Sequence, residues 1–218
     1  MFKVLPWHHR GGKPELQEGL GLSSIVYLLR HGETDWNADG RLQGQTDIPL
    51  NDQGRAQAHA VSAAVATLDI AACYASDLSR AYETAQISLS RHPAQYIPIP
   101  HPALRERHFG VMNGKTHDEI EAHKKAHPDF YIDLDGTGRL FPRDGEDDHT
   151  WMARVHSCLI DLPKSHDRPV LLVCHGGIIR QMLRSFAPAV PMFQPGNCHL
   201  YRMSRQNDGW QFDQIWPE

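Results

Sequence analysis

The fold is decided by the stretch Ile25-Val26-Tyr27-Leu28-Leu29-Arg30-His31-Gly32-Glu33-Thr34. Its first five residues form a continuous apolar run, which predicts a strand covered on both faces. The turn Arg30-His31-Gly32 follows at the carboxyl end of that strand, where open α/β sheets bind their ligands. A second apolar run, Val170 to Cys174, is followed in the same way by His175, Gly176 and Gly177. The two strand-end histidines predict one site built from distant parts of the chain.

Strand and helix patterns alternate along the rest of the chain. Strands are predicted over residues 25–29, 70–75, 96–100, 170–174, 199–203 and 210–215, and helices from about 51 to 68, over 78–89, from 117 onward, over 150–162 and over 177–186. This alternation predicts an α/β fold, a three-layer sandwich with a mostly parallel central sheet, helices on both faces and a lid insertion.

The composition divides the chain into an extension and one domain. Residues 1–24 contain several prolines, glycines and histidines but lack the basic start and apolar run of a signal peptide, so we expect an N-terminal extension. Residues 25–218 are predicted to form a single domain, which 218 residues in total can supply with a sizeable core. Around residues 112–148 the sequence becomes polar and then loop-like, and we expect the lid there.

Charge and cysteine usage exclude several classes of partner. A formal net charge of -4 gives no reason to expect nucleic acid or an anionic membrane as a partner, so an anionic substrate must be drawn by local cations. No stretch is long and apolar enough to span a bilayer. The four cysteines lack paired metal-type spacing, and Cys73 and Cys174 lie in apolar runs. We therefore expect reduced thiols in a cytoplasmic protein. Nothing in the sequence predicts an oligomeric state.

Four blocks of sequence carry a family resemblance. They are Arg30 to Asn37 with its continuation Arg41 to Gly44, then Leu78 to Ala81, then Leu104 to Gly110, and finally His175-Gly176. In this order they resemble the motifs of the histidine phosphatase superfamily, in the branch that includes phosphoglycerate mutases and fructose-2,6-bisphosphatases. The resemblance implies phosphoryl transfer at a histidine, with a small phosphorylated substrate and no cofactor.

The resemblance implies roles for three catalytic residues. His31 is the expected nucleophile, since a neutral imidazole nitrogen can attack phosphorus and form a phosphohistidine. Nearby cations should lower its pKa below the usual value of about 6.5, and its other nitrogen should donate to a backbone carbonyl. Glu106 is the expected general acid, which then acts as a base toward water. His175 is expected to be a third cation or donor, whereas Glu33 should only hydrogen-bond within the site.

The remaining site residues are expected to bind the phosphate. Arg30 and Arg80 supply forked donors that match phosphate oxygens. Gly176 has no side chain to keep a backbone N–H from approaching the phosphate. Asn37 is expected to orient another phosphate oxygen as a neutral donor, and the resemblance implies that Gln43 and Gly44 lie at the rim of the pocket.

No metal site is predicted, because the sequence has no clustered set of carboxylate or histidine ligands. His123 and His127 lie four residues apart, as helical zinc ligands do. They lack the intervening glutamate and a third ligand, so they predict an exposed helix face. Side-chain cations are expected to take the part that magnesium plays in other phosphoryl-transfer sites.

The sequence favours a phosphatase over two alternatives. A phosphoglycerate mutase would share every catalytic residue. Phe109, however, lacks the hydroxyl of the mutases' tyrosine, Gly114-Lys115-Thr116 resembles the broad phosphatases, and Lys124-Lys125 is the nearest basic pair to the mutases' adjacent arginines. The sequence also stops soon after its last predicted strand, without the mutases' longer ending. The second alternative is a non-catalytic protein that binds a phosphorylated ligand.

Overall fold

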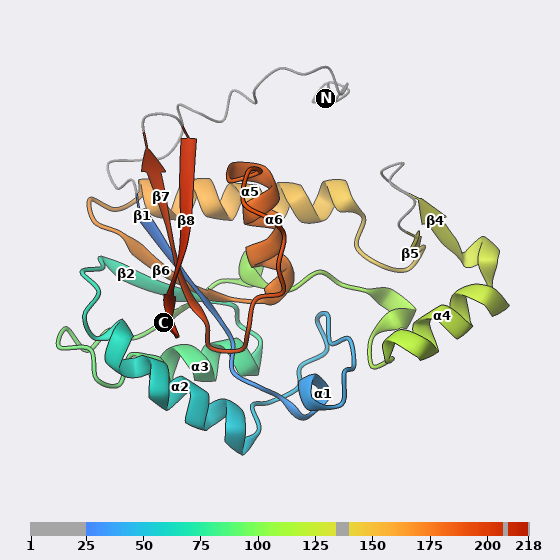
Figure 1. Cartoon of the computed structure of the whole chain (residues 1–218), viewed down its shortest axis with the longest axis horizontal. Helices are drawn as coiled ribbons and strands as arrows, with labels where there is room; N and C mark the ends of the chain where they lie inside the picture. The colour runs from blue at the N-terminus through green and yellow to red at the C-terminus, as the bar shows by residue number, and fades with distance from the viewer. Residues whose placement is uncertain (1–24, 134–139, 207–208, 218) are drawn as a thin grey trace.

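A computed structural model describes residues 25–133, 140–206 and 209–217, so the predicted extension lies outside the described residues. A central six-stranded sheet has the order β3-β2-β6-β1-β7-β8 (Figure 1). Its strands are β1 (Ile25–Arg30), β2 (Ala72–Ala75), β3 (Ile99–Pro100), β6 (Val170–Cys174), β7 (Leu200–Gln206) and β8 (Gly209–Trp216). The first four of these are parallel, β7 is antiparallel to β1, and β8 is antiparallel to β7. The predicted three-layer α/β fold with a mostly parallel sheet is confirmed.

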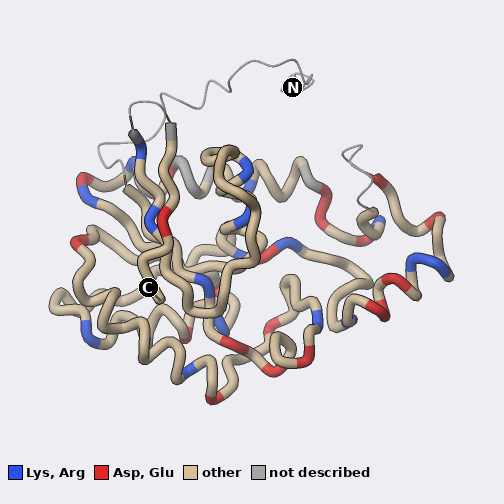
Figure 2. Tube along the Cα trace, viewed as in Figure 1, with Lys and Arg blue, Asp and Glu red and all other residues tan. Residues whose placement is uncertain are grey.

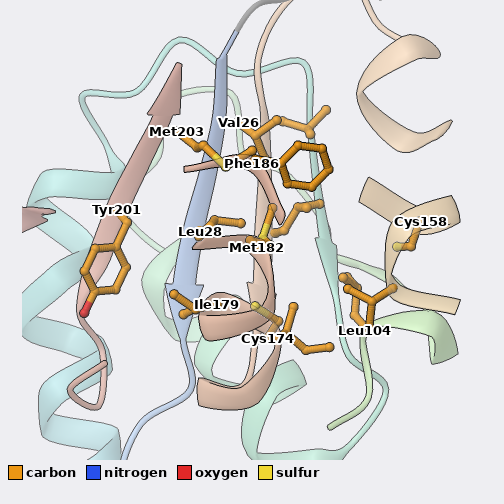
Figure 3. Close-up of a cluster of buried hydrophobic side chains, with 14 of the residues drawn as sticks. Val26, Leu28, Leu104, Cys158, Cys174, Ile179, Met182, Phe186, Tyr201 and Met203 are labelled. Atoms are coloured by element: carbon orange, nitrogen blue, oxygen red, sulfur yellow. The ribbon is translucent and has the colours of Figure 1, made fainter. Parts of the chain in front are cut away.

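Two helical layers cover the sheet and explain why its middle strands are apolar throughout. Helices α2 (Asp52–Val65) and α3 (Ser79–Ser88) pack on one face, and α5 (Asp148–Lys164) and α6 (Gly176–Phe186) pack on the other. Along β1, Val26 and Leu28 belong to the core under α5 and α6, while Leu29 belongs to the core under α2 and α3. Figure 3 shows the first of these cores, in which Ile179, Met182 and Phe186 of α6 lie against the sheet.

Side-chain caps begin the helices near the expected positions. Asn51 caps α2, with its side chain accepting a hydrogen bond from Gly54 N at 2.8 Å, and Asp147 caps α5 in the same way. Thr116 forms a capping box with Glu119 at the start of α4 (His117–Ala126). A second capping box, between Thr34 and Asn37, begins the short helix α1 (Asp35–Ala38), which the sequence reading missed. These caps satisfy backbone N–H groups that have no partner within a helix.

The predicted insertion lies at one end of the molecule, away from the central sheet (Figure 1). It contains α4, the 3-10 turn η4 (Pro128–Phe130) and an antiparallel pair, β4 (Tyr131–Asp133) and β5 (Leu140–Pro142). The loop-like character expected for the later part of the insertion was therefore wrong at these two strands. Ile132 pairs with Phe141, and such apolar cross-strand pairs stabilise a short ladder that composition alone does not reveal.

Several boundaries differ from the predictions for local reasons. The helix expected to reach Leu68 ends at Val65, and the strand expected from Ile70 begins at Ala72. Of the strand expected over 96–100, only Ile99 and Pro100 pair with β2, since Pro98 has no N–H to donate. The chain then continues through the 3-10 turns η2 (Pro102–Leu104) and η3 (Gly110–Met112). Among the described residues, no helix has the length and apolarity needed to cross a membrane.

Candidate active site

The sheet brings the two strand-end histidines side by side. Strands β1 and β6 are parallel neighbours with Arg30 opposite Cys174, and His31 N donates to Cys174 O at 3.0 Å. The imidazole rings of His31 and His175 consequently lie 5.1 Å apart, centre to centre. Both side chains are buried and line a cavity of about 460 Å³. The single site predicted from the two strand ends is formed.

One ring nitrogen of His31 makes a hydrogen bond to the backbone, and the other has no hydrogen-bond partner among the described residues. Nδ1 donates to the carbonyl oxygen of Gly32 at 2.7 Å, as expected, which places the lone pair on Nε2. No described residue hydrogen-bonds to Nε2. Burial, and then the charges of Arg80 and Arg30, hold the pKa of His31 well below its usual value. The expected lowering by cations is present, but burial is the larger cause. At neutral pH the ring is therefore uncharged and nucleophilic.

Arg30 and Arg80 bring two guanidinium groups to this histidine. Arg30 donates from Nη1 to the carbonyl oxygen of Pro195. Arg80 donates from Nη1 to Thr46 O at 2.8 Å and from Nη2 to Gly44 O at 2.7 Å. The Nε atoms of both arginines are buried without a hydrogen-bond partner in the described structure. Burial lowers the pKa of Arg80 to about 10, so it remains a cation at neutral pH. Buried, incompletely paired cations favour a bound anion.

His175 differs from the expected third cation. Burial, followed by the charge of Arg80, holds its pKa well below the usual value, so the ring is neutral. Its Nε2 lies 2.9 Å from Ser76 Oγ, while Nδ1 is buried without a partner among the described residues. Burial disfavours the cationic form most, and the positive charges of Arg80 and Arg30 in the same cavity add to this effect. The other role expected for His175, a hydrogen-bond donor, is compatible with a neutral ring.

Glu106 reaches the same cavity from the loop after η2. Its carboxylate accepts two backbone hydrogen bonds, from Arg107 N to Oε1 at 2.9 Å and from Gly177 N to Oε2 at 2.8 Å. A Cβ on Gly177 would lie 2.2 Å from Oε1, so this position requires glycine. Gly177 lies in the first turn of α6, where the helix dipole favours negative charge. The carboxyl group is thereby held in one place.

The remaining predicted residues also line the cavity. Gly176 is the first residue of α6, where helix N-termini bind phosphates. Gly44 has φ +54, and its carbonyl holds Arg80. Gln43 is buried, and its Oε1 has no partner in the described structure. Asn37 uses Oδ1 in the α1 capping box, which leaves its Nδ2 to donate. The structure thus brings all nine predicted site residues to one cavity.

Sequence reasoning missed three further residues that either line the cavity or contact a residue that lines it. Ser76, which holds His175, follows the end of β2, so the strand-end argument could have found it. Arg180 lies one helical turn after Gly176, a spacing that puts both on one face of α6. Asn197 donates from Nδ2 to His31 O at 3.0 Å and to Asn37 Oδ1 at 3.4 Å, and no sequence signal marks it.

Two histidines and one glutamate lie away from this chemistry. Glu33 accepts from Asn51 Nδ2 at 3.0 Å and does not line the cavity, so its expected place in the site was wrong. The rings of His123 and His127 lie tilted by 44° with their centres 4.5 Å apart, and Nδ1 of His123 lies 2.8 Å from the hydroxyl of Tyr131. Within residues 25–133, 140–206 and 209–217, no group of three His, Cys, Asp or Glu side chains could hold a metal ion.

Positively charged side chains are concentrated at the cavity. Figure 2 shows basic and acidic residues interspersed over the molecule, in keeping with the net charge of -4. The cavity is instead lined by Arg30, Arg41, Arg80, Lys115 and Arg180, with Glu106 as its carboxylate. Cations gathered in a partly enclosed site attract anions that the whole surface does not. This arrangement can bind a phosphoryl group beside the free nitrogen of His31.

The chain is similar to known proteins over most of its length. The histidine phosphatase superfamily (branch 1) matches residues 26–216. Phosphoglycerate mutase-like protein 4 of Arabidopsis thaliana is 32% identical over 200 residues, 88% of this chain and 84% of that protein. A glucosyl-3-phosphoglycerate phosphatase of Mycolicibacterium vanbaalenii is 37% identical over 168 residues, 71% of this chain and 70% of the relative. The solved structure of mycobacterial hydrolase 1 superposes with a TM-score of 0.73 at 30% identity, covering 89% of this chain and 98% of that one. This chain belongs to the histidine phosphatase superfamily, in its branch 1.

Proposed function

We propose that the protein is a phosphomonoester hydrolase that acts on a small phosphorylated metabolite through a phosphohistidine, without a metal ion. One observation carries the proposal. The unprotonated Nε2 of a buried, neutral His31 lies in a cavity with the incompletely paired guanidinium groups of Arg30 and Arg80. Nucleophile and phosphate-binding cations are thus assembled before substrate arrives, which is what an in-line phosphoryl transfer requires.

In the first step His31 forms a bond to phosphorus. Nε2 attacks the phosphorus atom as the bond to the ester oxygen breaks, and the leaving oxygen takes its proton from protonated Glu106. The guanidinium groups of Arg30 and Arg80 stabilise the charge on the three non-bridging oxygens. The products are phosphohistidine, a free alcohol and ionised Glu106.

In the second step water releases the phosphate. Ionised Glu106 takes a proton from a water molecule, whose oxygen attacks phosphorus while the N–P bond breaks. Inorganic phosphate leaves, and both His31 and Glu106 return to their starting states. One carboxyl group therefore serves as acid and then as base.

A mutase is the second candidate, favoured by the name of the Arabidopsis relative. A mutase must keep phosphohistidine away from water until an isomeric acceptor binds. Phe109 lines the cavity with a ring that has no hydroxyl to hold an acceptor, and Lys124 and Lys125 lie on α4 outside the lining. In addition, the relative that is named a phosphatase, the glucosyl-3-phosphoglycerate phosphatase of Mycolicibacterium vanbaalenii, is 37% identical to this chain over 168 residues. These observations favour hydrolysis.

Other parts of the proposal rest on separate observations. The intact set of Arg30, His31, Arg80, Glu106 and His175 argues against a non-catalytic binding protein. Lys115, His117 and Ile120 of the insertion line the cavity, which supports a lid within one domain over residues 25–218. The four cysteines are free and buried, which supports a reducing, cytoplasmic setting.

The test measures phosphate release and isomerisation together. With 4-nitrophenyl phosphate after prolonged chelation, we expect steady release of inorganic phosphate. With 3-phosphoglycerate, with or without bisphosphoglycerate, we expect negligible 2-phosphoglycerate. Isomerisation faster than phosphate release would establish the mutase. Activity that chelation removes and magnesium or zinc restores would overturn metal independence, and the absence of turnover would favour the binding protein.

A further inference from the structure

Arg154, on α5, holds the backbone that carries Glu106. Its Nη1 donates to Ala103 O at 2.9 Å and to Arg105 O at 2.8 Å, and its Nη2 lies 3.4 Å from Glu106 O. One guanidinium group therefore contacts three carbonyls within four residues. Arg154 does not line the cavity, so these contacts are not part of substrate binding.

Glu146 completes this arrangement from the end of the insertion. Its carboxylate pairs with Arg154 through two bonds, Nε to Oε1 at 2.9 Å and Nη2 to Oε2 at 2.8 Å. Oε2 also accepts from His108 N at 3.2 Å, and Glu146 N donates to His108 O at 2.8 Å. Arg107 Nε donates to Glu146 O at 2.9 Å. The pair is largely buried, with side chains 21% and 12% exposed, so water screens it little.

Together Glu146 and Arg154, the acid clamp, hold the chain on both sides of Glu106. The carboxyl group itself is held by Arg107 N and Gly177 N. Arg107 is held in place because its Nε donates to Glu146 O, and Gly177 belongs to α6. The acid clamp therefore determines where the Glu106 carboxyl lies relative to α6 and the cavity. A movement of about 1 Å can cost a positioned group roughly a hundredfold in rate.

We propose that Arg154 and Glu146 are positioning residues that place the Glu106 carboxyl against the leaving oxygen. The inference rests on the proposed function, in which Glu106 donates its proton as the P–O bond breaks. No proton passes to or from the clamp. Protonation matters for a basic alkoxide and little for a stabilised aryl oxide. A loosened clamp should consequently slow alkyl phosphates selectively, whereas a purely structural defect should slow all substrates alike.

Arg154→Lys is the main test, because lysine keeps the charge but cannot make the forked contacts. We expect kcat/KM for glycerol phosphate to fall by about 10- to 100-fold, part of the contribution of general acid catalysis, and that for 4-nitrophenyl phosphate to change by less than about threefold. Glu146→Gln should give the same selectivity and decides the matter if Arg154→Lys does not fold. Arg202→Lys is the matched control, since Arg202 pairs with Asp213 on the β7–β8 ladder, and it should change neither rate.

Glu106→Gln separates the inference from the proposed function. If Glu106 is the acid, this variant alone should lower kcat/KM for glycerol phosphate selectively, because kcat/KM does not include the later hydrolysis of phosphohistidine. Adding Arg154→Lys should then cause no further loss in kcat/KM. Selective loss in Glu106→Gln with equal loss for both substrates in the clamp variants would overturn the inference alone. An undiminished effect of Arg154→Lys in the Glu106→Gln background would also overturn it. Equal loss for both substrates in Glu106→Gln itself would overturn the acid role and the inference with it.

Discussion

At the scale of single residues, the side chains of His31 and Glu106 are each held by hydrogen bonds with the backbone. Gly32 O accepts a hydrogen bond from Nδ1 of His31, and two backbone N–H groups donate to the carboxylate of Glu106. Backbone partners cannot change rotamer, so the two side chains proposed to react are held by the main chain itself. Such preorganisation lowers the cost of reaching the transition state. It also makes the site sensitive to small changes beside these partners.

Gly177→Ala should remove most of the activity toward alkyl phosphates, because its Cβ would lie 2.2 Å from Glu106 Oε1 and must displace the carboxyl. We expect a loss of at least about 100-fold in kcat/KM, the scale of general acid catalysis. Gly176→Ala is the matched variant, since its Cβ would come no closer than 3.5 Å to Arg30 Nε. Gly176 is a proposed phosphate-binding residue at the N-terminus of α6, so Gly176→Ala should slow alkyl and aryl phosphates alike, whereas the loss in Gly177→Ala should be selective for alkyl phosphates. Equal losses for alkyl and aryl phosphates in Gly177→Ala, measured by steady-state kinetics, would contradict this account of Glu106.

The elements themselves were largely predictable, because β1 and β6 carry the apolar runs of strands buried on both faces. The strand-end position of His31 and His175 followed from the same runs. Glu106 was found only through the family resemblance, since a loop residue has no periodicity. The β4–β5 pair and Asn197 were missed because contacts between distant segments create them. Local sequence carries little information about such contacts.

Helix α2 begins against the active-site turn, and its cap should contribute measurably to stability. Asn51 accepts from Gly54 N and donates to Glu33 Oε1, so Asn51→Ala removes both bonds. We expect the free energy of unfolding to fall by about 1–2 kcal/mol in urea titrations. Asp52→Ala, at a fully exposed neighbour that pairs with Arg55, should cost much less, because exposed ion pairs contribute little. A loss for Asn51→Ala no larger than for Asp52→Ala would show that the cap does not stabilise the helix.

For the whole molecule, the site's histidines link folding to pH. The pKa values of His31 and His175 are well below 6.5 in the folded state, mainly through burial. Below about pH 6.5 these two histidines therefore bind protons in the unfolded chain but not in the folded chain. The free energy of unfolding consequently falls as the pH falls. Each group contributes up to about 1.4 kcal/mol per pH unit in that window.

The free energy of unfolding should therefore be lower at pH 5.5 than at pH 7.5, and His175→Gln should reduce this difference by roughly 1 kcal/mol. His59→Gln, at an exposed position on α2, is the control and should leave the difference unchanged. Urea titrations at the two pH values measure it. A pH dependence that His175→Gln leaves intact would contradict a neutral, buried His175.

The central claim is that Nε2 of His31 carries the phosphoryl group. Brief reaction with substrate followed by rapid quenching should leave an acid-labile phosphate on the enzyme, and peptide mass spectrometry under alkaline conditions should place it on His31. His31→Ala should show neither the phosphate nor turnover. Phosphate found on another residue of the intact enzyme, or turnover by His31→Ala, would contradict the account.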